Sequence, residues 1–305
     1  MRIMGLSGTL KQALATLLFC LVTIGVTCTA RGENPPYTDT ETTLPNVIFS
    51  SDPSSFMALE ALPDATRIMA DWRSTEDAFP LKAKPKDPNP VIINEIIRIP
   101  YLFRGTFNDG SEIEVHVNRE IGTRLHASES AERYLKVIGQ LPAILRTGVR
   151  IVWLHKEGPE RKFALNQGIY LNDVEATKFL EEETLEEILF HEATHSSLGF
   201  LHNESPDWQA AQTADGQFIS EYGRDNPVRE DVAESFMAYY AIRYRPSRIP
   251  EIDLQTILET IPERINYFDL WVLDLEHVRP QWRCTTCEHT LPVSQWHCPT
   301  CELGS

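Results

Sequence analysis

Two histidines and a glutamate form the stretch of this chain that is best suited to chemistry. His191-Glu192-Ala193-Thr194-His195 has the spacing H-E-x-x-H. On an α-helix, side chains four positions apart lie on the same face, so both imidazoles can bind one metal ion. Glu192 lies between them, where it can take a proton from a water that the metal activates. Imidazole ligands, a carboxylate base and an open coordination position are what hydrolytic zinc chemistry requires.

A buried helix is expected to carry this motif, whose spacing is typical of zinc-dependent peptidases. Thr184 and Glu187 match a capping box and predict the helix start. Apolar residues then cover more than one face, which indicates burial: Leu185, Ile188, Leu189, Phe190, Ala193 and Leu198. Gly199 predicts the end of the helix. The histidines should therefore lie on a buried helix, one side of which opens to a cleft.

A catalytic zinc site has three protein ligands and an open position, and two residues compete for the third place. His202 comes close to the metzincin pattern H-E-x-x-H-x-x-G-x-x-H, but one extra residue separates His195 from Gly199. That residue rotates the chain by about 100°, which should misdirect the third imidazole. The Met-turn of metzincins is not evident either, because Met237 lies in a helical pattern.

The other candidate, Glu230, lies in a stretch that resembles a known family. Two segments carry the resemblance: Glu221-Tyr222-Gly223-Arg224-Asp225-Asn226 and Glu230-Asp231-Val232-Ala233-Glu234-Ser235-Phe236. Over about residues 185–245 the chain closely resembles the anthrax lethal-factor-like metallopeptidases, which include secreted Pro-Pro endopeptidases. In that family a Ser-Tyr-Gly or similar turn precedes a helix of the form E-x-x-A-E-x-F. The insertion Pro227-Val228-Arg229 and Glu221 are particular to this chain.

The resemblance implies a role for each of these residues. Glu230 would be the third zinc ligand and Tyr222 would assist catalysis by donating a hydrogen bond to the developing oxyanion. Glu234, one helical turn after Glu230, would orient a zinc-bound histidine. Glu192 would act as the general base and later as the acid that protonates the leaving amine. Without the resemblance, the glutamates would be interpreted as a solvated helix face and Tyr222 as a turn residue.

Four cysteines near the C-terminus form two C-x-x-C pairs: Cys284, Cys287, Cys298 and Cys301. Four thiolates at this spacing predict a structural zinc site of the ribbon type. Two disulfides are the alternative, because the N-terminus indicates export to an oxidising compartment. We therefore predict a zinc-ribbon-like module over residues 281–305, with a structural zinc in addition to the catalytic one.

The N-terminus has the pattern of a secretory signal over residues 1–30. Arg2 and Lys11 precede or flank an apolar stretch at residues 13–26, and Cys28-Thr29-Ala30 offers a cleavage site. A membrane anchor is the alternative. The protein is thus expected to be secreted, or periplasmic in a bacterium, without stable membrane association after cleavage. Residues 31–90 are expected to form a flexible extension or a propeptide, with a possible short helix near residues 55–72.

The remaining patterns predict an α+β peptidase domain over residues 91–280 with a zincin-like core. β-rich stretches flank an Asn108-Asp109-Gly110 turn, which predicts a hairpin. The other expected elements are a helix at residues 128–145, strands at 150–154 and 168–171, and helices at 228–244 and 252–276. By analogy with zincins, the strand at 168–171 can pair with an extended substrate.

The net charge of −16 leaves no basic footprint for nucleic acid. We therefore predict a secreted zinc metalloendopeptidase that cleaves a protein or peptide substrate. A catalytically silent zincin-fold binding protein and a metzincin-like protease that uses His202 are the alternatives.

Overall fold

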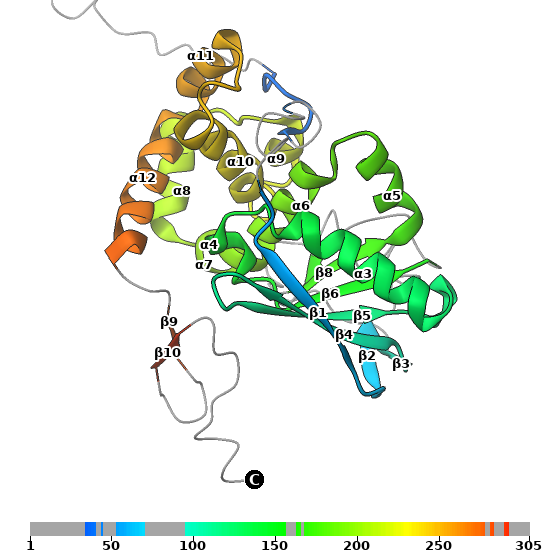
Figure 1. The fold of residues 1–305 in the computed structure, drawn as a ribbon. Coiled ribbons are helices and arrows are strands. Elements are labelled where there is room, and N and C mark those ends of the chain that lie inside the picture. The colour runs from blue at the N-terminus through cyan, green and yellow to red at the C-terminus, as the bar shows by residue number, and fades with distance from the viewer. Residues whose placement is uncertain are drawn as a thin grey trace, which may run out of the picture. The chain divides into compact units, whose positions relative to one another are not determined.

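A mixed six-stranded sheet forms one part of the computed structural model, which describes residues 34–40, 44, 53–70, 95–156, 163–165, 168–277, 281–283 and 290–292 (Figure 1). Its strands in spatial order are β1 (Phe56–Leu62), β4 (Tyr101–Phe107), β5 (Glu112–Val117), β6 (Ile151–His155), β8 (Gly168–Asn172) and β7 (Phe163–Leu165). β1, β4 and β5 pair antiparallel, β5, β6 and β8 pair parallel, and β7 pairs antiparallel with β8. The α+β class predicted from the sequence is confirmed.

The hairpin predicted around Asn108-Asp109-Gly110 joins β4 to β5. Gly110 adopts a φ of 82°, which glycine reaches without the steric penalty of a Cβ atom. The Asp109 carboxylate accepts a hydrogen bond from the Ser111 backbone N–H at 2.9 Å and pairs with Arg146. The local turn chemistry thus sets the register in which Tyr101 faces Val117.

One face of the sheet is covered by α3 (Arg124–Ile138), which contacts β1, β4 and β5, and by α6 (Leu185–Thr194), which contacts β7 and β8. A single helix was expected over residues 128–145, but α3 ends at Ile138 and a short α4 (Ala143–Arg146) follows. Pro142 lies at the start of α4, and a proline inside a continuous helix would lose a backbone hydrogen bond and clash with the preceding turn. Thr123 caps α3 by accepting from the His126 N–H, which starts the helix earlier than expected.

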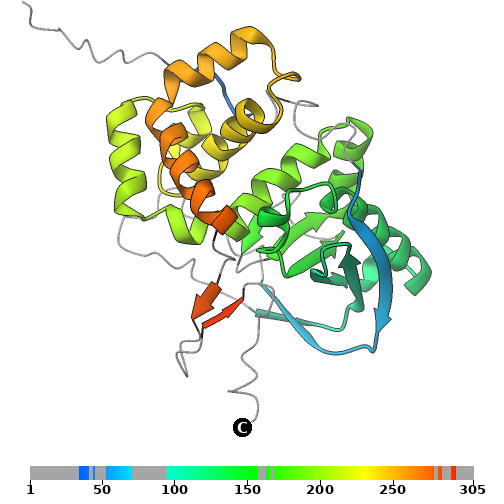
Figure 2. The same ribbon diagram turned by 60° about the vertical axis from the view of Figure 1, so that its left-hand side comes forward.

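The second half of the chain is helical. Its elements are α5 (Asp173–Glu181), α7 (Phe200–His202), α8 (Pro206–Asp215), α9 (Glu221–Asp225), α10 (Asp231–Tyr244), α11 (Glu251–Thr260) and α12 (Pro262–His277). The helix expected over residues 252–276 is interrupted before Pro262, which opens α12 where its missing N–H is tolerated. Figures 1 and 2 show α8 to α12 gathered beside α6, with the sheet and α3 on the other side of α6. Within the described residues, no helix has the length and apolar character that crossing a bilayer demands.

Part of the segment expected to be a flexible extension belongs to the fold. The helix predicted near residues 55–72 is wrong: β1 occupies residues 56–62 and β2 (Arg67–Ala70) pairs with β3 (Glu95–Arg98). β1 joins the sheet through β4, with Leu62 opposite Leu102. Pairing with a distant strand decides the conformation here, and local sequence patterns do not report it.

Two predicted regions lie outside the described residues. These are the signal segment at residues 1–30 and the four cysteines, Cys284, Cys287, Cys298 and Cys301. From the C-terminal region the structure describes β9 (Gln281–Arg283) and β10 (Thr290–Pro292), which pair antiparallel. The zinc-ribbon-like module therefore stays a prediction.

A buried arginine ties α12 to α8 and α10. Arg264 is fully buried, and its guanidinium donates to Asp231 at 2.9 Å and to Asp215 at 2.8 Å. Gln212 also donates to Asp231, at 2.9 Å. Because Asp231 is the first residue of α10, this network holds the helix start, and Glu230 directly precedes it.

Replacing Arg264 by Met should lower the free energy of unfolding by about 3–5 kcal/mol, because two carboxylates would stay buried without their cation. The matched control is Arg243→Met, which breaks a partly exposed pair with Asp269 and should change stability by about 1 kcal/mol or less. Urea denaturation of both variants measures the difference. Equal losses for the two variants would show that the buried network does not stabilise the helical half.

Candidate metal centre

The helix that carries H-E-x-x-H forms as predicted. α6 runs from Leu185 to Thr194, and nearly all of its residues are buried. The imidazole rings of His191 and His195 face the same side, with centroids 4.7 Å apart. The predicted capping box is absent: the Thr184 side chain makes no cap, and its hydroxyl donates to the Phe179 carbonyl at 3.4 Å. The helix is stabilised by its burial rather than by that cap.

The helix does not end at Gly199, and that prediction is wrong. A π-helical segment, His195–Gly199, continues α6 directly into α7, and Gly199 has right-handed helical angles, φ −53° and ψ −47°. A π-turn accommodates one extra residue without breaking the helix, and such turns are frequent at functional sites. Gly148 lets another part of the chain approach here, since a Cβ atom on it would lie 2.5 Å from the Ser197 Cα.

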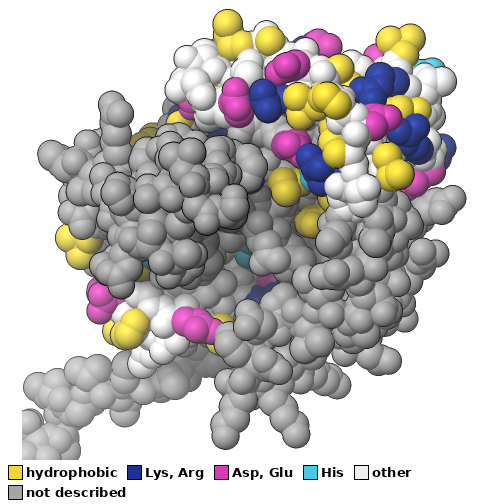
Figure 3. Space-filling view, turned by 90° about the horizontal axis from the view of Figure 1, so that it is seen from below, with side chains coloured by type: hydrophobic (Ala, Val, Ile, Leu, Met, Phe, Trp, Pro, Cys, Tyr) yellow, Lys and Arg dark blue, Asp and Glu magenta, His cyan; other side chains and the backbone are white. Residues whose placement is uncertain are grey.

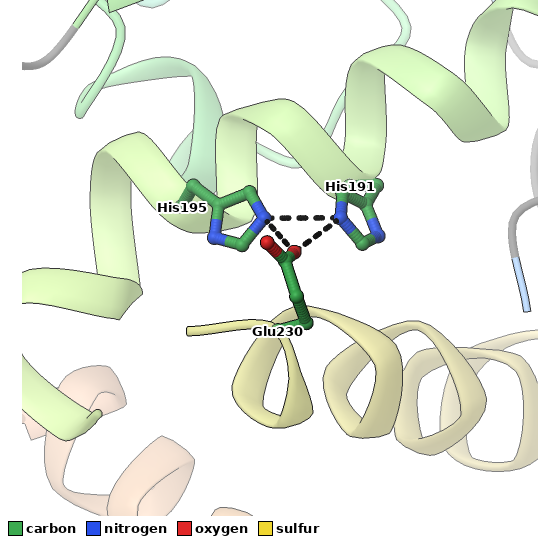
Figure 4. Close-up of side chains that lie close together, drawn as sticks. All are labelled: His191, His195 and Glu230. Atoms are coloured by element: carbon green, nitrogen blue, oxygen red, sulfur yellow. Dashed lines mark hydrogen bonds and ion pairs between the residues drawn. The ribbon is translucent and has the colours of Figure 1, made fainter. Parts of the chain in front are cut away.

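Glu230, which precedes the first turn of α10, meets the two histidines (Figure 4). Its Oε2 lies 3.3 Å from His191 Nε2 and 2.8 Å from His195 Nε2, and the two Nε2 atoms are 3.0 Å apart. Ligands of a tetrahedral zinc ion at about 2.0–2.1 Å are separated by roughly 3.3 Å. The triangle of donor atoms therefore has nearly the size that zinc requires, and two imidazoles and a carboxylate are ligands that zinc accepts.

The electrostatics of the triangle suit a cation. Burial would raise the pKa of the Glu230 carboxyl, but the charge of His195 and hydrogen bonds from both imidazoles hold it well below its usual value. Glu230 is thus an anion in a buried site. The Arg229 guanidinium approaches its other oxygen, with Nε 3.6 Å from Oε1.

Glu234 lies behind His191. Its Oε1 is 3.2 Å from His191 Nδ1, the ring nitrogen that faces away from the triangle. Burial raises the pKa of the Glu234 carboxyl, but the adjacent His191 imidazole outweighs it and lowers the pKa. A carboxylate in this place fixes the tautomer and the orientation of a metal-binding imidazole.

Tyr222 borders the site from α9. Ser220 caps this short helix by accepting from the Gly223 N–H at 2.9 Å, and the Tyr222 ring lies 6.4 Å from the His191 ring, centroid to centroid. Burial and the negative charges of Glu230 and Glu192 raise the pKa of the Tyr222 hydroxyl. The hydroxyl therefore keeps its proton and remains a hydrogen-bond donor. Glu192 itself is buried, with 5% of its surface exposed.

His202 lies away from these residues. Its Nδ1 contacts the Tyr267 hydroxyl at 2.5 Å, and its ring packs edge-on against Trp271 with centroids 4.4 Å apart. Burial lowers the pKa of His202 to about 4. The structure thus brings His191, His195 and Glu230 together and leaves His202 at the end of α7, packed against α12.

Sequence reasoning missed one residue that contacts this group. Thr40 is fully buried and donates to the Glu234 carboxylate, although 194 positions separate the two residues. No local spacing or motif signals such a contact. Comparisons with protein families, curated proteins and solved structures find no match to this chain.

Proposed function

We propose that the protein is a zinc metalloendopeptidase with a zincin-like core. One observation carries the proposal: Glu230, 39 positions after His191, comes within reach of both histidines of H-E-x-x-H at distances close to those between zinc ligands. A chance motif would not require a buried carboxylate from another helix to converge on the same point. His191, His195 and Glu230 would hold the ion.

The surrounding architecture supports the same proposal. α6 lies against a mixed sheet, and the strand that contacts α6 at the sheet edge, β7, runs antiparallel to its neighbour. The helical half of the chain supplies Glu230 from the other side of α6. A sheet on one side of the motif helix and the third ligand on the other is the arrangement expected of a zincin.

Each residue has a part in peptide hydrolysis. When bound, zinc supplies a Lewis acid that acidifies water and polarises a carbonyl. Glu192 accepts the proton of the attacking water and delivers it to the leaving amine. Tyr222 donates its hydroxyl hydrogen to the carbonyl oxygen as negative charge develops there. Glu234 keeps the His191 ring in the orientation that binding requires.

An extended substrate would pair with β7. The prediction that β8 pairs with the substrate is wrong, because β8 lies between β6 and β7 and both of its edges are occupied. Among the described strands, β7 ends the sheet on this side. A peptide added there would gain backbone hydrogen bonds next to α6.

Replacing Tyr222 by Phe should lower kcat by about 10²–10³-fold, the usual effect of removing one donor to an oxyanion. Zinc content and KM should change little, because the lost hydroxyl would act mainly on the transition state. Steady-state kinetics with a cleaved peptide measure this. Tyr244→Phe, another exposed tyrosine, is the control. A higher KM with unchanged kcat would instead indicate that Tyr222 binds the substrate.

The surface charge agrees with a protein or peptide substrate rather than nucleic acid. On the described part of the face in Figure 3, Lys and Arg side chains are interspersed with Asp and Glu. The chain as a whole carries a net charge of −16. Three parts of the proposal rest on the sequence: secretion, the lack of stable membrane association after signal cleavage, and a structural zinc in the C-terminal module.

Cleavage of a diverse peptide library tests the proposal. The mature protein with added zinc is compared with its chelator-treated form, and products are identified by mass spectrometry. Cuts that appear only with zinc, and that depend on Glu192, are the expected result. Intact zinc binding without any cleaved peptide would favour the alternative, a catalytically silent binding protein.

A further inference from the structure

Residues 34–40, here called the N-terminal segment, run along the elements that carry the candidate metal centre. Tyr37 forms an isolated parallel bridge with Ser220, directly before α9. Its N–H donates to the Ile219 carbonyl at 3.3 Å, and its carbonyl accepts from the Glu221 N–H at 2.8 Å. The Tyr37 hydroxyl donates to Asp253 at 2.8 Å. The segment is therefore fixed to the helical half by both its backbone and its side chain.

The same segment holds the turn that carries Tyr222. The Tyr222 N–H donates to the Thr38 carbonyl at 3.1 Å. Two consecutive backbone donors of α9, those of Glu221 and Tyr222, are thus satisfied by the N-terminal segment. The first N–H groups of a helix have no partner within it, so these bonds fix the start of α9.

Thr40 ends the segment at Glu234. Its backbone N–H donates to Glu234 Oε2 at 2.9 Å, and its hydroxyl lies 3.1 Å from the same oxygen. The other carboxylate oxygen is the one that faces His191 Nδ1 at 3.2 Å. Both Thr40 and Glu234 are fully buried, so water does not replace these bonds readily. A continuous path of contacts leads from Thr40 through Glu234 to His191.

We propose that the N-terminal segment is a positioning element of the site, in which Thr40 holds the Glu234 carboxylate in place against His191. This inference rests on the proposed function. Thr40 is a positioning residue, because it acts through Glu234 and does not reach the donor triangle. The segment is then required for activity, in contrast to an inhibitory propeptide, whose removal raises activity.

The test compares Thr40→Val, Thr40→Ser and Glu234→Gln, with the double variant Thr40→Val/Glu234→Gln. Valine removes the hydroxyl but has nearly the shape of threonine, and serine retains the hydroxyl. Thr260→Val is the matched control, since this buried hydroxyl donates to the Thr256 carbonyl within the same helix, α11, at 2.6 Å. Zn²⁺ affinity is measured by chelator competition, and the absorption spectrum of Co²⁺-loaded protein reports the geometry of the ligands.

Thr40→Val should weaken Zn²⁺ affinity on the order of 10-fold, at the lower end of the 10–100-fold range for residues that support metal ligands. Thr40→Ser and Thr260→Val should bind as the unmutated protein does. In the Glu234→Gln background Thr40→Val should add nothing, because the residue through which it acts is already changed. The Co²⁺ spectra of Thr40→Val and Glu234→Gln should shift in the same direction.

Unchanged Zn²⁺ affinity in Thr40→Val would overturn this inference and leave the proposed function intact. Additive losses in the double variant would overturn it as well, since Thr40 would then act independently of Glu234. If the unmutated protein bound no Zn²⁺, the proposed function would fail, and the inference with it. Removal of residues 34–40 that raised peptidase activity would favour the propeptide instead.

Discussion

Glu192→Gln should keep its zinc and lose nearly all turnover, with kcat/KM reduced by roughly 10²–10⁴-fold. Glutamine has the size of glutamate, so the buried place between the histidines stays filled. Its amide cannot accept a proton from water at neutral pH, and the base of the reaction is lost. None of the three proposed metal ligands changes, which is why binding and turnover should separate in this variant.

Glu186→Gln is the control for this experiment, because it makes the same substitution in the first turn of α6, about 1.4 turns before His191. Zinc stoichiometry by atomic spectroscopy and peptide cleavage by mass spectrometry are measured on all three proteins. Peptidase activity retained in Glu192→Gln would refute Glu192 as the base. A loss of zinc in the same variant would show that Glu192 supports the metal rather than the proton transfer.

Glu230→Ala should abolish tight zinc binding, with affinity falling by more than roughly 100-fold. Changes to residues that only support ligands already cause losses of roughly 10–100-fold, and a ligand contributes more. The substitution also removes the buried negative charge that faces both imidazoles, at 2.8 Å from His195 and 3.3 Å from His191. Two histidines without that charge form an incomplete site.

His202→Ala is the matched comparison. His202 is the alternative third ligand suggested by the sequence, and in the structure it contacts Tyr267 and Trp271 instead of the other two histidines. It should keep one zinc per chain at this centre. Titration of both variants with Zn²⁺, after circular dichroism has shown that they are folded, separates the two assignments. Full binding in Glu230→Ala together with loss in His202→Ala would restore the metzincin-like assignment.

The elements that local chemistry determines were predictable from the sequence. The apolar run around His191 fixed the identity of α6, and Asn108-Asp109-Gly110 fixed the hairpin, because each signal lies within a few residues. The ends of α6 were not predictable. The Thr184 hydroxyl donates to the Phe179 carbonyl instead of capping the helix. At the other end, the π-helical segment continues the helix through Gly199.

Contacts between distant residues were beyond the same reasoning. β1 is a strand because β4 offers it an edge, and Thr40 matters to Glu234 because the chain returns to it 194 positions later. The place of Glu230 was implied by a resemblance, since a glutamate on a helix start has no spacing relation to His191. The structure brings the side chains within reach of one another, and their roles stay predictions that the variants test.

The N-terminal segment also bears on when the candidate metal centre can assemble during synthesis of the chain. Thr40 and Tyr37 are made long before their partners Glu234 and Asp253, which lie 194 and 216 positions later. Closing such long loops is entropically unfavourable until the later helices exist, and contacts of this range slow folding. The histidines are thus made before Glu230, 39 positions after His191, and they wait for it before the group can assemble. The candidate metal centre therefore becomes complete only after Glu230 and Glu234 have been made, so the early nascent chain cannot bind a metal there with all three ligands.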